Sequence, residues 1–517
     1  MIRNTQNIPG DRGVRPAGWI VLLGFAVGTA LLYLPVWWNG FLTDDYASLY
    51  RLLIEKRVLF EGMVRPLIDI SFYFNYLISG LHPGSYYIFN LCVHALACYM
   101  VYRVALDLPL FAGRQQSIFA LTAGFLFLFY PFHNEGVVWL SGRLPSMAAL
   151  FGLMAIHFSL TKKWPWNFLL AAACWFVGLF AYESIIVLPG IVVLLEWIRF
   201  RDARRGLLSA GAWVIAGLLW LGLRYLAAGT LLPGYGKSGL AGEPVVRRMV
   251  KVLGRCFLPP EENSKLMMIL FGVVMVLIGI VHIVMWARLR QGFGYLRRVV
   301  RRPKVGGQGQ GWSYVALELS FLLALLPAIA FGVSTRTSEG DRLLYFPSCI
   351  LCLLSGAVLL SLLPGRRWRL LLCGVYGVAS VVFITGSNRR WVFASRVAEA
   401  TLDMVRQAPG RLLLVNAPDE WEVAYIFRNS FKNGLVVNGI DTNKVAVTHF
   451  LTRLEYLRVE GRIGPLRRDS SLFIYPATRI VRSGDGFRVT GIADLFHVKE
   501  DRVYYWDKYE WKQLILN

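Results

Sequence analysis

The sequence predicts a polytopic α-helical membrane protein that ends in a small soluble α+β domain. Of the 517 residues, 56% are hydrophobic and only 17% are charged, whereas soluble domains carry about 25% charged residues. The mean hydropathy is +0.49. Apolar runs of bilayer-spanning length recur as far as residue 384, and the chain after them reads as short strands and turns.

A membrane-spanning helix needs about 20 mostly apolar residues, and about eleven segments come near this length. The first is too long for the apolar core of a signal peptide and lacks a clear cleavage site, so we expect it to remain as an anchor. The segments are Trp19–Trp38, Tyr86–Val104, Ser117–Phe132, Leu144–Leu160, Trp166–Ala181, Ser184–Trp197, Leu207–Leu223, Leu266–Trp286, Val315–Val333, Leu343–Leu363 and Leu370–Ile384.

Basic residues predict the orientation. With the N-terminus in the cytoplasm, every second loop is rich in Lys and Arg, as the positive-inside rule requires. We therefore expect a multi-pass protein of the bacterial inner membrane with a periplasmic C-terminal domain. These cytoplasmic loops account for the net charge of +23, so no nucleic-acid partner is expected.

Two of the expected external loops, residues 40–85 and 224–265, also carry several cations. Either the topology differs there, or these cations bind a phosphate at the membrane surface. We favour a phosphate, because reversing either loop would spoil the charge pattern of its neighbours.

The chain is expected to divide into a membrane domain, residues 1–386, and a soluble domain, residues 387–517, of ordinary domain size. In the soluble part, residues 411–416 read as a buried strand and residues 420–431 as a helix. Hairpins are expected where turn residues separate alternating runs, at 483–486 and 507–508.

Ionisable groups gather at the expected external ends of the spans, where their desolvation makes them functional candidates. Asp44 and Asp45 lie at the start of the first external loop. Adjacent carboxylates there can serve as a general base or as a metal site, and Thr43 or Asp44 could instead simply cap a helix. Carboxylates and arginines at one membrane face suit a substrate with an anionic head and an apolar tail. The other candidates are Arg65, His133, Glu135, Arg143, Glu183, Arg224, Glu339, Arg342 and Tyr345.

Other polar and aromatic residues have structural interpretations. Asn90 and His94 lie four residues apart and hence on one helix face, where joining neighbouring helices is the favoured role. Trp139, with other aromatic residues at span ends, suits an interfacial aromatic belt.

Together these residues resemble the GT-C superfamily of integral-membrane glycosyltransferases, and more closely the bacterial relatives of the transmembrane-and-TPR O-mannosyltransferases. The resemblance covers roughly residues 19–386. The matching positions are Asp44-Asp45, Arg65-Pro66, Asn90 and His94, Pro131, His133, Glu135, Gly142 and Arg143, Glu183, and the run Arg342, Tyr345, Pro347 and Ser348. The TPR array of the family is missing, and Tyr182 and Asp341 replace a family Lys and Glu.

The resemblance implies a GT-C fold and transfer of a sugar from a polyprenyl-phosphate carrier to an acceptor hydroxyl on the external face, with inversion. It implies Asp44, and next Asp45, as the general base. It also implies Arg65, Arg224 and Arg342 as groups that stabilise the leaving phosphate. His133, Glu135 and Arg143 would shape the sugar site or order their loop, and Glu183, Glu339 and Tyr345 complete the donor-binding set.

The sequence leaves several points open. The acceptor is a protein, a glycan or a lipid, and membrane lipids surround the spans. No metal ligand set is predicted, and a divalent cation, Mg²⁺ or Mn²⁺, stays open as a cofactor.

Three rival functions remain at this point. A polysaccharide polymerase or ligase would use a polyprenyl-pyrophosphate donor. A lipid-glycan transporter or flippase would place its binding groups near the membrane midplane and often shows internal repeats. A scaffold would use only its soluble tail.

Overall fold

The computed structural model describes residues 16–517 apart from 59–63, 162–165, 201, 232–242, 262, 300–307, 364, 429, 454, 457–463, 466–470, 475–477, 484–485, 490–494, 498–501, 508 and 515–517. Several of the basic residues that predict the orientation, at 1–15, 162–163 and 301–304, lie outside the described residues. The predicted fold class is confirmed: a polytopic helical bundle is followed by a small domain of short strands.

Every predicted span coincides with a helix. Seven of the described helices are long and apolar enough to cross a membrane, and α1 and α8 are shorter apolar helices. The helices at the predicted spans are α1 (Gly18–Leu32), α4 (Gly84–Asp107), α5 (Gly113–Leu128), α7 (Arg143–Leu160), α8 (Asn167–Leu179), α9 (Leu188–Phe200), α10 (Ala203–Ala228), α12 (Ser264–Val299), α13 (Gln308–Phe331), α14 (Tyr345–Leu362) and α15 (Arg366–Gln407).

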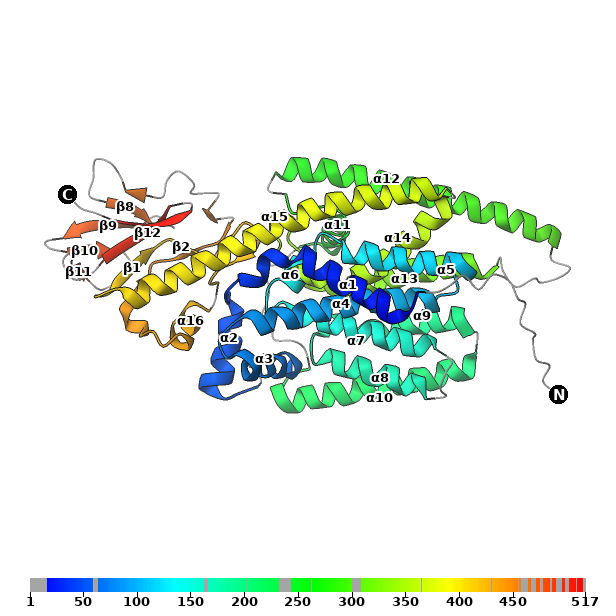
Figure 1. The fold of residues 1–517 in the computed structure, drawn as a ribbon, viewed down its shortest axis with the longest axis horizontal. Helices are drawn as coiled ribbons and strands as arrows, with labels where there is room; N and C mark the ends of the chain where they lie inside the picture. The colour runs from blue at the N-terminus through cyan, green and yellow to red at the C-terminus, as the bar shows by residue number, and fades with distance from the viewer. Residues whose placement is uncertain are drawn as a thin grey trace.

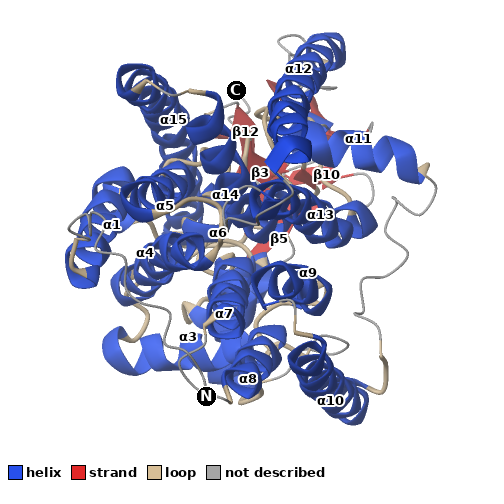
Figure 2. Cartoon of the chain, turned by 90° about the vertical axis from the view of Figure 1, so that its right-hand side faces the viewer, coloured by secondary structure: helices blue, strands red, loops and turns tan. Residues whose placement is uncertain are grey.

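The helices differ in how much of their surface the bundle covers. The helices α4, α5, α7 and α14 pack against one another, and most of α14 is buried. Figure 2 shows α10, α12 and α15 at the periphery. These three helices leave most of their apolar side chains exposed. Since apolar surface of this extent is stable in lipid, the peripheral helices are suited to face the bilayer.

The loops between spans contain further helices. They are α2 (Asp44–Tyr50), α3 (Pro66–Ser79), α6 (Asn134–Val137) and α11 (Val245–Arg255). Figure 1 shows α2, α3 and α6 toward the end of the bundle from which the C-terminal strands extend. The long external loops of the prediction are therefore partly helical.

Helix α15 joins the bundle to the tail. It continues without a break from Arg366 to Gln407, through the position where the composition placed the boundary between the two domains. In Figure 1 it runs from the bundle alongside the strands of the tail. A continuous helix of this length connects the two parts rigidly.

The tail is built on two main sheets. The first has the order β13-β12-β1-β5, in which β1 is parallel to β12 and β5, and the second is antiparallel in the order β11-β10-β9-β8-β7. The strands are β1 (Leu412–Val415), β5 (Val445–Val447), β7 (Gly464–Pro465), β8 (Ser471–Ile474), β9 (Thr478–Ser483), β10 (Gly486–Val489), β11 (Leu495–His497), β12 (Arg502–Asp507) and β13 (Glu510–Gln513). The predicted strand at 411–416 and both hairpins are confirmed.

The predicted helix over 420–431 is wrong. This segment contains the strands β3 (Glu420–Trp421) and β4 (Ala424–Tyr425), and the helix α16 begins only at Phe431 and ends at Val437. Glu422 and Arg428 adopt positive φ values of 51° and 38°, which a helix cannot accommodate. The chain instead pairs with its neighbours: β2 (Ala417–Pro418) lies beside β6 (Phe450–Leu451).

The tail is docked on α2 at the end of the bundle. Helix α16 packs against α2, and Gly434 of α16 faces the ring of Tyr46 so closely that an added Cβ would lie 3.3 Å from the ring carbons. The backbone N–H of Thr43 donates to the carbonyl of Ile426 over 2.9 Å. The tail therefore contacts the helix that carries Asp44 and Asp45.

Replacing Gly434 with Leu is expected to separate α16 from α2, because the larger side chain overlaps the Tyr46 ring. Overpacking of this kind costs about 1–3 kcal/mol. Limited proteolysis of the detergent-solubilised protein should cut the variant between bundle and tail faster than the wild type. The control is Lys432→Leu, at an exposed position of the same helix. Equal cleavage of Gly434→Leu and wild type would contradict the docking.

Candidate active site

Asp44 opens into a cavity of about 370 Å³, which we call the Asp44 cavity. Four segments far apart in the sequence form its walls: α2, α3, the loop that leads into α7, and α16 of the tail. Its lining residues are Asp44, Ala47, Ser48, Arg51, Arg65, Ile68, Asp69, Trp139, Ser141, Leu144, Ser430 and Asn433.

The two adjacent aspartates have different surroundings. Asp44 lines the cavity, and its carboxylate has no hydrogen-bond or ion-pair partner within the described part of the chain. Asp45 is buried and accepts two backbone N–H groups, from Leu42 over 2.9 Å and from Ser141 over 2.7 Å. Asp44 is therefore available to a ligand, whereas Asp45 ties α2 to the loop before α7.

Burial raises the pKa of Asp45 from its ordinary 3.8 to about 7, against the opposing effect of the hydrogen bonds with Ser141 and Leu42. The expected capping role of Thr43 is not found, since no side-chain hydrogen bond caps α2. Thr43 instead has a φ of 37°, a strained value for a β-branched residue. The hydrogen bond from its N–H to the tail holds this conformation directly before Asp44.

Glu183 joins two of the predicted phosphate-binding arginines. Its Oε2 lies 2.8 Å from Nη2 of Arg65, and its Oε1 lies 2.9 Å from Nη1 of Arg224. Arg224 is fully buried, while Arg65 reaches the cavity and lies over the Tyr182 ring, 4.6 Å from its centroid. One carboxylate therefore joins two guanidinium groups at this wall.

Glu135 organises the opposite part of the site. Its Oε1 lies 2.9 Å from Nη1 of Arg342, and its Oε2 accepts the backbone N–H of Arg342 over 2.7 Å. The hydroxyl of Tyr425, in the tail, donates to the same carboxylate over 3.2 Å. The Arg342 guanidinium lies 5.5 Å from the centroid of the Trp139 ring, so Arg342 approaches the Asp44 cavity from behind Trp139.

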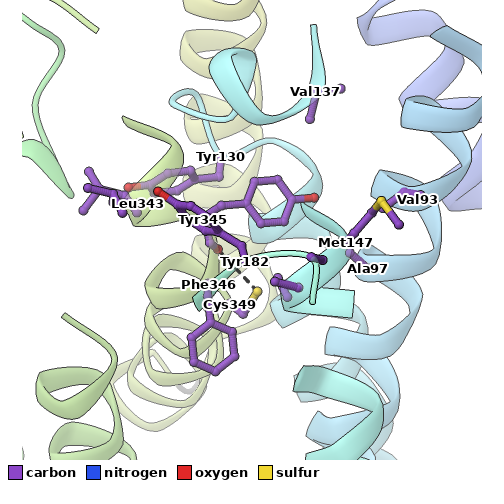
Figure 3. Close-up of a cluster of buried hydrophobic side chains, with 14 of the residues drawn as sticks. Val93, Ala97, Tyr130, Val137, Met147, Tyr182, Leu343, Tyr345, Phe346 and Cys349 are labelled. Atoms are coloured by element: carbon purple, nitrogen blue, oxygen red, sulfur yellow. Dashed lines mark hydrogen bonds between the residues drawn. The ribbon is translucent and has the colours of Figure 1, made fainter. Parts of the chain in front are cut away.

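His133 and Tyr345 lie in the core of the bundle. His133 Nε2 is 2.8 Å from the Ser348 hydroxyl, and Tyr345 OH is 2.6 Å from Nδ1 of His94. Figure 3 shows Tyr345 within a cluster of buried side chains that includes Tyr130 and Leu343. Asn90 donates to the carbonyl groups of two residues of the 133–142 loop. His94 and Asn90 thus have the packing role that the sequence favours.

Two further candidates also lie away from the cavity. Arg143 is fully buried and donates to Asn75 over 2.7 Å and to Ser71 over 3.0 Å, which ties α7 to α3. Glu339 pairs with Arg428 of the tail. Of the predicted set, Asp44 and Arg65 line the cavity, and the contacts of Asp45, Glu135, Glu183, Arg224 and Arg342 surround it.

Glu135 also lines a second cavity, of about 590 Å³, between the bundle and the tail. Its polar residues are mostly paired: Arg390 with Glu422, and Asp341 with Arg255. Val382 and Phe383 of α15 give it an apolar, exposed side. It holds no residue of α2, so it is separate from the Asp44 cavity.

No group of three His, Cys, Asp or Glu residues that could hold a metal ion occurs in the described ranges. Asp69 shares the cavity with Asp44, but its carboxylate is paired with Arg51 over 3.1 Å. Asp45 is engaged by two backbone N–H groups. No chemical step is therefore assigned to a metal ion.

Trp139, Ser430 and Asn433 are cavity residues that sequence reasoning missed. Trp139 is only 3% exposed, so its interpretation as part of an interfacial belt is wrong. The available signal in the sequence was the presence of a Trp in the same loop as Glu135. Ser430 and Asn433 gave no signal, because they belong to a tail that reads as a separate domain.

None of the known protein-family models matches the chain. The chain is 37% identical to Protein O-mannosyl-transferase Tmtc1 of Drosophila melanogaster over 95 residues, which are 18% of this chain and 10% of that protein. It is 33% identical to human Protein O-mannosyl-transferase TMTC3 over 103 residues, 20% of this chain and 11% of that protein. The matches span about a tenth of the length of these relatives. They confirm the predicted resemblance to the transmembrane-and-TPR O-mannosyltransferases.

Among solved structures, the chain is similar to ArnT from Cupriavidus metallidurans, crystallised with undecaprenyl phosphate. The TM-score is 0.45 and the identity 13%, over 93% of this chain and 99% of that one.

The raised pKa of Asp45 predicts a pH-dependent stability. Between pH 4 and 7 the unfolded chain ionises this group while the folded protein keeps it protonated, so folding binds an extra proton and stability falls as the pH rises. The contribution is up to about 4 kcal/mol. In thermal unfolding from pH 4 to 8, the melting temperature of wild type relative to Asp45→Asn should therefore fall. A constant difference between the two proteins would contradict the burial effect.

Proposed function

We propose that this chain is a membrane glycosyltransferase that moves a sugar from a polyprenyl-phosphate carrier to an acceptor hydroxyl at the extracytoplasmic face. The observation that carries the proposal is an unpaired carboxylate, Asp44, in one cavity with a guanidinium group, Arg65. The names of the curated relatives, protein O-mannosyl-transferases, suggest the reaction class. Mannose is accordingly the sugar to test first.

Asp44 is the general base of the proposed reaction. An acceptor hydroxyl is a weak nucleophile at neutral pH, and a carboxylate within hydrogen-bond reach removes its proton as the new glycosidic bond forms. Asp44 is free for this role, whereas the carboxylate of Asp45 is already bound to two backbone N–H groups. Asp45 is a positioning residue that fixes α2 against the loop before α7.

Arg65 stabilises the leaving group. As the acceptor oxygen bonds to the anomeric carbon, the bond from that carbon to the phosphate oxygen breaks, and the electron pair remains on the polyprenyl phosphate. A fixed guanidinium group beside this oxygen favours the charge that develops there. Displacement in one step inverts the anomeric centre. Glu183 and Arg224 hold Arg65 in place by the shared ion pairs.

The position of α3 suits a lipid-linked donor. Arg65 immediately precedes this helix. Ile70, Phe74 and Leu77 along it expose apolar side chains. The polyprenyl chain would lie against these side chains while its phosphate contacts Arg65. The cavity lies at the tail end of the bundle, which in the proposed orientation is periplasmic, and the acceptor is a protein, a glycan or a lipid.

Asp44→Asn is expected to lower turnover by about 10²- to 10⁴-fold, because the base is lost. Release of free polyprenyl phosphate from polyprenyl-phosphate mannose, in membranes that contain the natural acceptor, measures this without knowledge of the acceptor. Thermal stability should be unchanged, since this carboxylate has no partner among the described residues. Glu55→Gln, at an exposed position of the same loop, is the control. Full activity in both Asp44→Asn and Asp45→Asn would refute the proposal.

Arg65→Gln is expected to lower the donor step by about 10²-fold, because a neutral amide stabilises the leaving phosphate poorly. The variant should fold, since Glu183 keeps Arg224 as its partner. Single-turnover release of polyprenyl phosphate, in membranes that contain the natural acceptor, measures the transfer step apart from product release. Arg57→Gln removes an exposed cation from the same loop and should keep the wild-type rate. Equal losses in both variants would point to a general charge effect instead.

A further inference from the structure

Trp139, a residue that lines the Asp44 cavity, carries a hydrogen-bond donor that the described part of the chain leaves unused. The residue is 3% exposed and lines the cavity. Its Nε1 is buried and has no hydrogen-bond partner within the described ranges. Buried polar groups are nearly always paired, and leaving one unpaired costs about 1–3 kcal/mol. A donor of this kind beside a catalytic cavity indicates that a ligand supplies the acceptor.

The ring of Trp139 is held rigidly by the groups around it. The Arg342 guanidinium lies over it, and the Tyr425 ring meets it edge to face with centroids 5.3 Å apart. Both neighbours are bound to the carboxylate of Glu135. The indole N–H is therefore fixed in direction before a ligand arrives, which reduces the entropy lost on binding.

The tail supplies a second unused polar group to the same cavity. Asn433 lines it from α16, and its amide has no partner in the described part of the chain. The contact of Gly434 with Tyr46 fixes α16 on α2. An amide both donates and accepts hydrogen bonds, so Asn433 and Trp139 together offer two donors and an acceptor from different walls.

We propose that Trp139 and Asn433 bind hydroxyl groups of the transferred sugar, so that its recognition site is shared between the bundle and the tail. This inference rests on the proposed function. A polyprenyl chain has no group that could bond to the indole N–H, and the phosphate is served by Arg65. The pyranose ring, which is bonded to the phosphate through its anomeric carbon, presents hydroxyls that match a lone donor and an amide.

The experiment compares mannose donors that each lack one hydroxyl, at carbon 2, 3, 4 or 6. Polyprenyl phosphate release should fall by about 10- to 100-fold with the donor that lacks the hydroxyl bound by Trp139, because the indole N–H is again unpaired. Trp139→Phe keeps a ring between Arg342 and Tyr425 but removes the N–H. This variant should use the complete donor only about 2-fold better than the donor that lacks that hydroxyl. With the other deoxy donors it should behave as the wild type does.

Asn433→Ala should lose discrimination at a different hydroxyl. Its position is half-buried, so this variant also tests the proposal if Trp139→Phe fails to fold. The matched controls are Trp213→Phe, whose indole N–H is bound to Ser209 in α10, and Lys432→Ala, at an exposed position of α16. Both controls should retain the wild-type pattern.

The proposal is overturned if Trp139→Phe and Asn433→Ala discriminate all four deoxy donors as the wild type does. A uniform loss with every donor would also overturn it, because that result indicates a structural role alone. Failure of the proposed function has a different signature: Asp44→Asn would release polyprenyl phosphate at the wild-type rate.

Discussion

The site depends on the buried carboxylate of Glu135. It binds the backbone N–H and the guanidinium group of Arg342, which lies three residues before α14 begins, and it accepts a hydrogen bond from the hydroxyl of Tyr425 in the tail. A buried carboxylate without such partners would be costly, so the loop that carries Glu135 is held to the two segments that supply them. Because Arg342 and Tyr425 both contact the Trp139 ring, the same interaction fixes this wall of the Asp44 cavity.

Desolvation also explains how the arginines are arranged. A guanidinium group near the membrane needs a carboxylate, and Arg65 and Arg224 share one, Glu183. Glu183 therefore fixes Arg65 at the cavity, where an anionic headgroup requires a cation. Asp44 is the opposite case, a carboxylate without a partner among the described residues. An unpaired base and a fixed cation in one cavity are the electrostatic basis of the proposed transfer.

Much of the helical part could be predicted from the sequence, because the bilayer imposes one length and one composition on every span. The grouping of acids and arginines at one end was also predictable, since their desolvation restricts where they can lie. The roles of adjacent residues were not. Consecutive helical residues point about 100° apart, so Asp44 faces the cavity while Asp45 faces the loop before α7. Only the packing of α2 decides between them.

Three of the predicted site residues have buried partners away from the Asp44 cavity. His133, Arg143 and Tyr345 carry the polar chemistry of a binding site, but each satisfies another buried group: Ser348, Asn75 and His94. A sequence motif cannot distinguish a side chain that binds a ligand from a side chain that holds a neighbouring segment in place. The predicted helix over 420–431 was wrong because strand pairing within the tail overrode the local helical pattern of this segment.

The tail is part of the cavity rather than an appendage to it. Its Ile426 carbonyl holds the strained backbone of Thr43, its Tyr425 hydroxyl binds Glu135, and its Asn433 amide lines the cavity wall. Each contact reaches a different segment of the bundle, and α15 connects the two parts without a break. The predicted boundary at residues 386 and 387, where the hydropathy falls, separates membrane spans from a tail outside them. It also separates residues that together form one cavity. Since the cavity needs both parts, its geometry depends on their docking as much as on the helices that cross the bilayer.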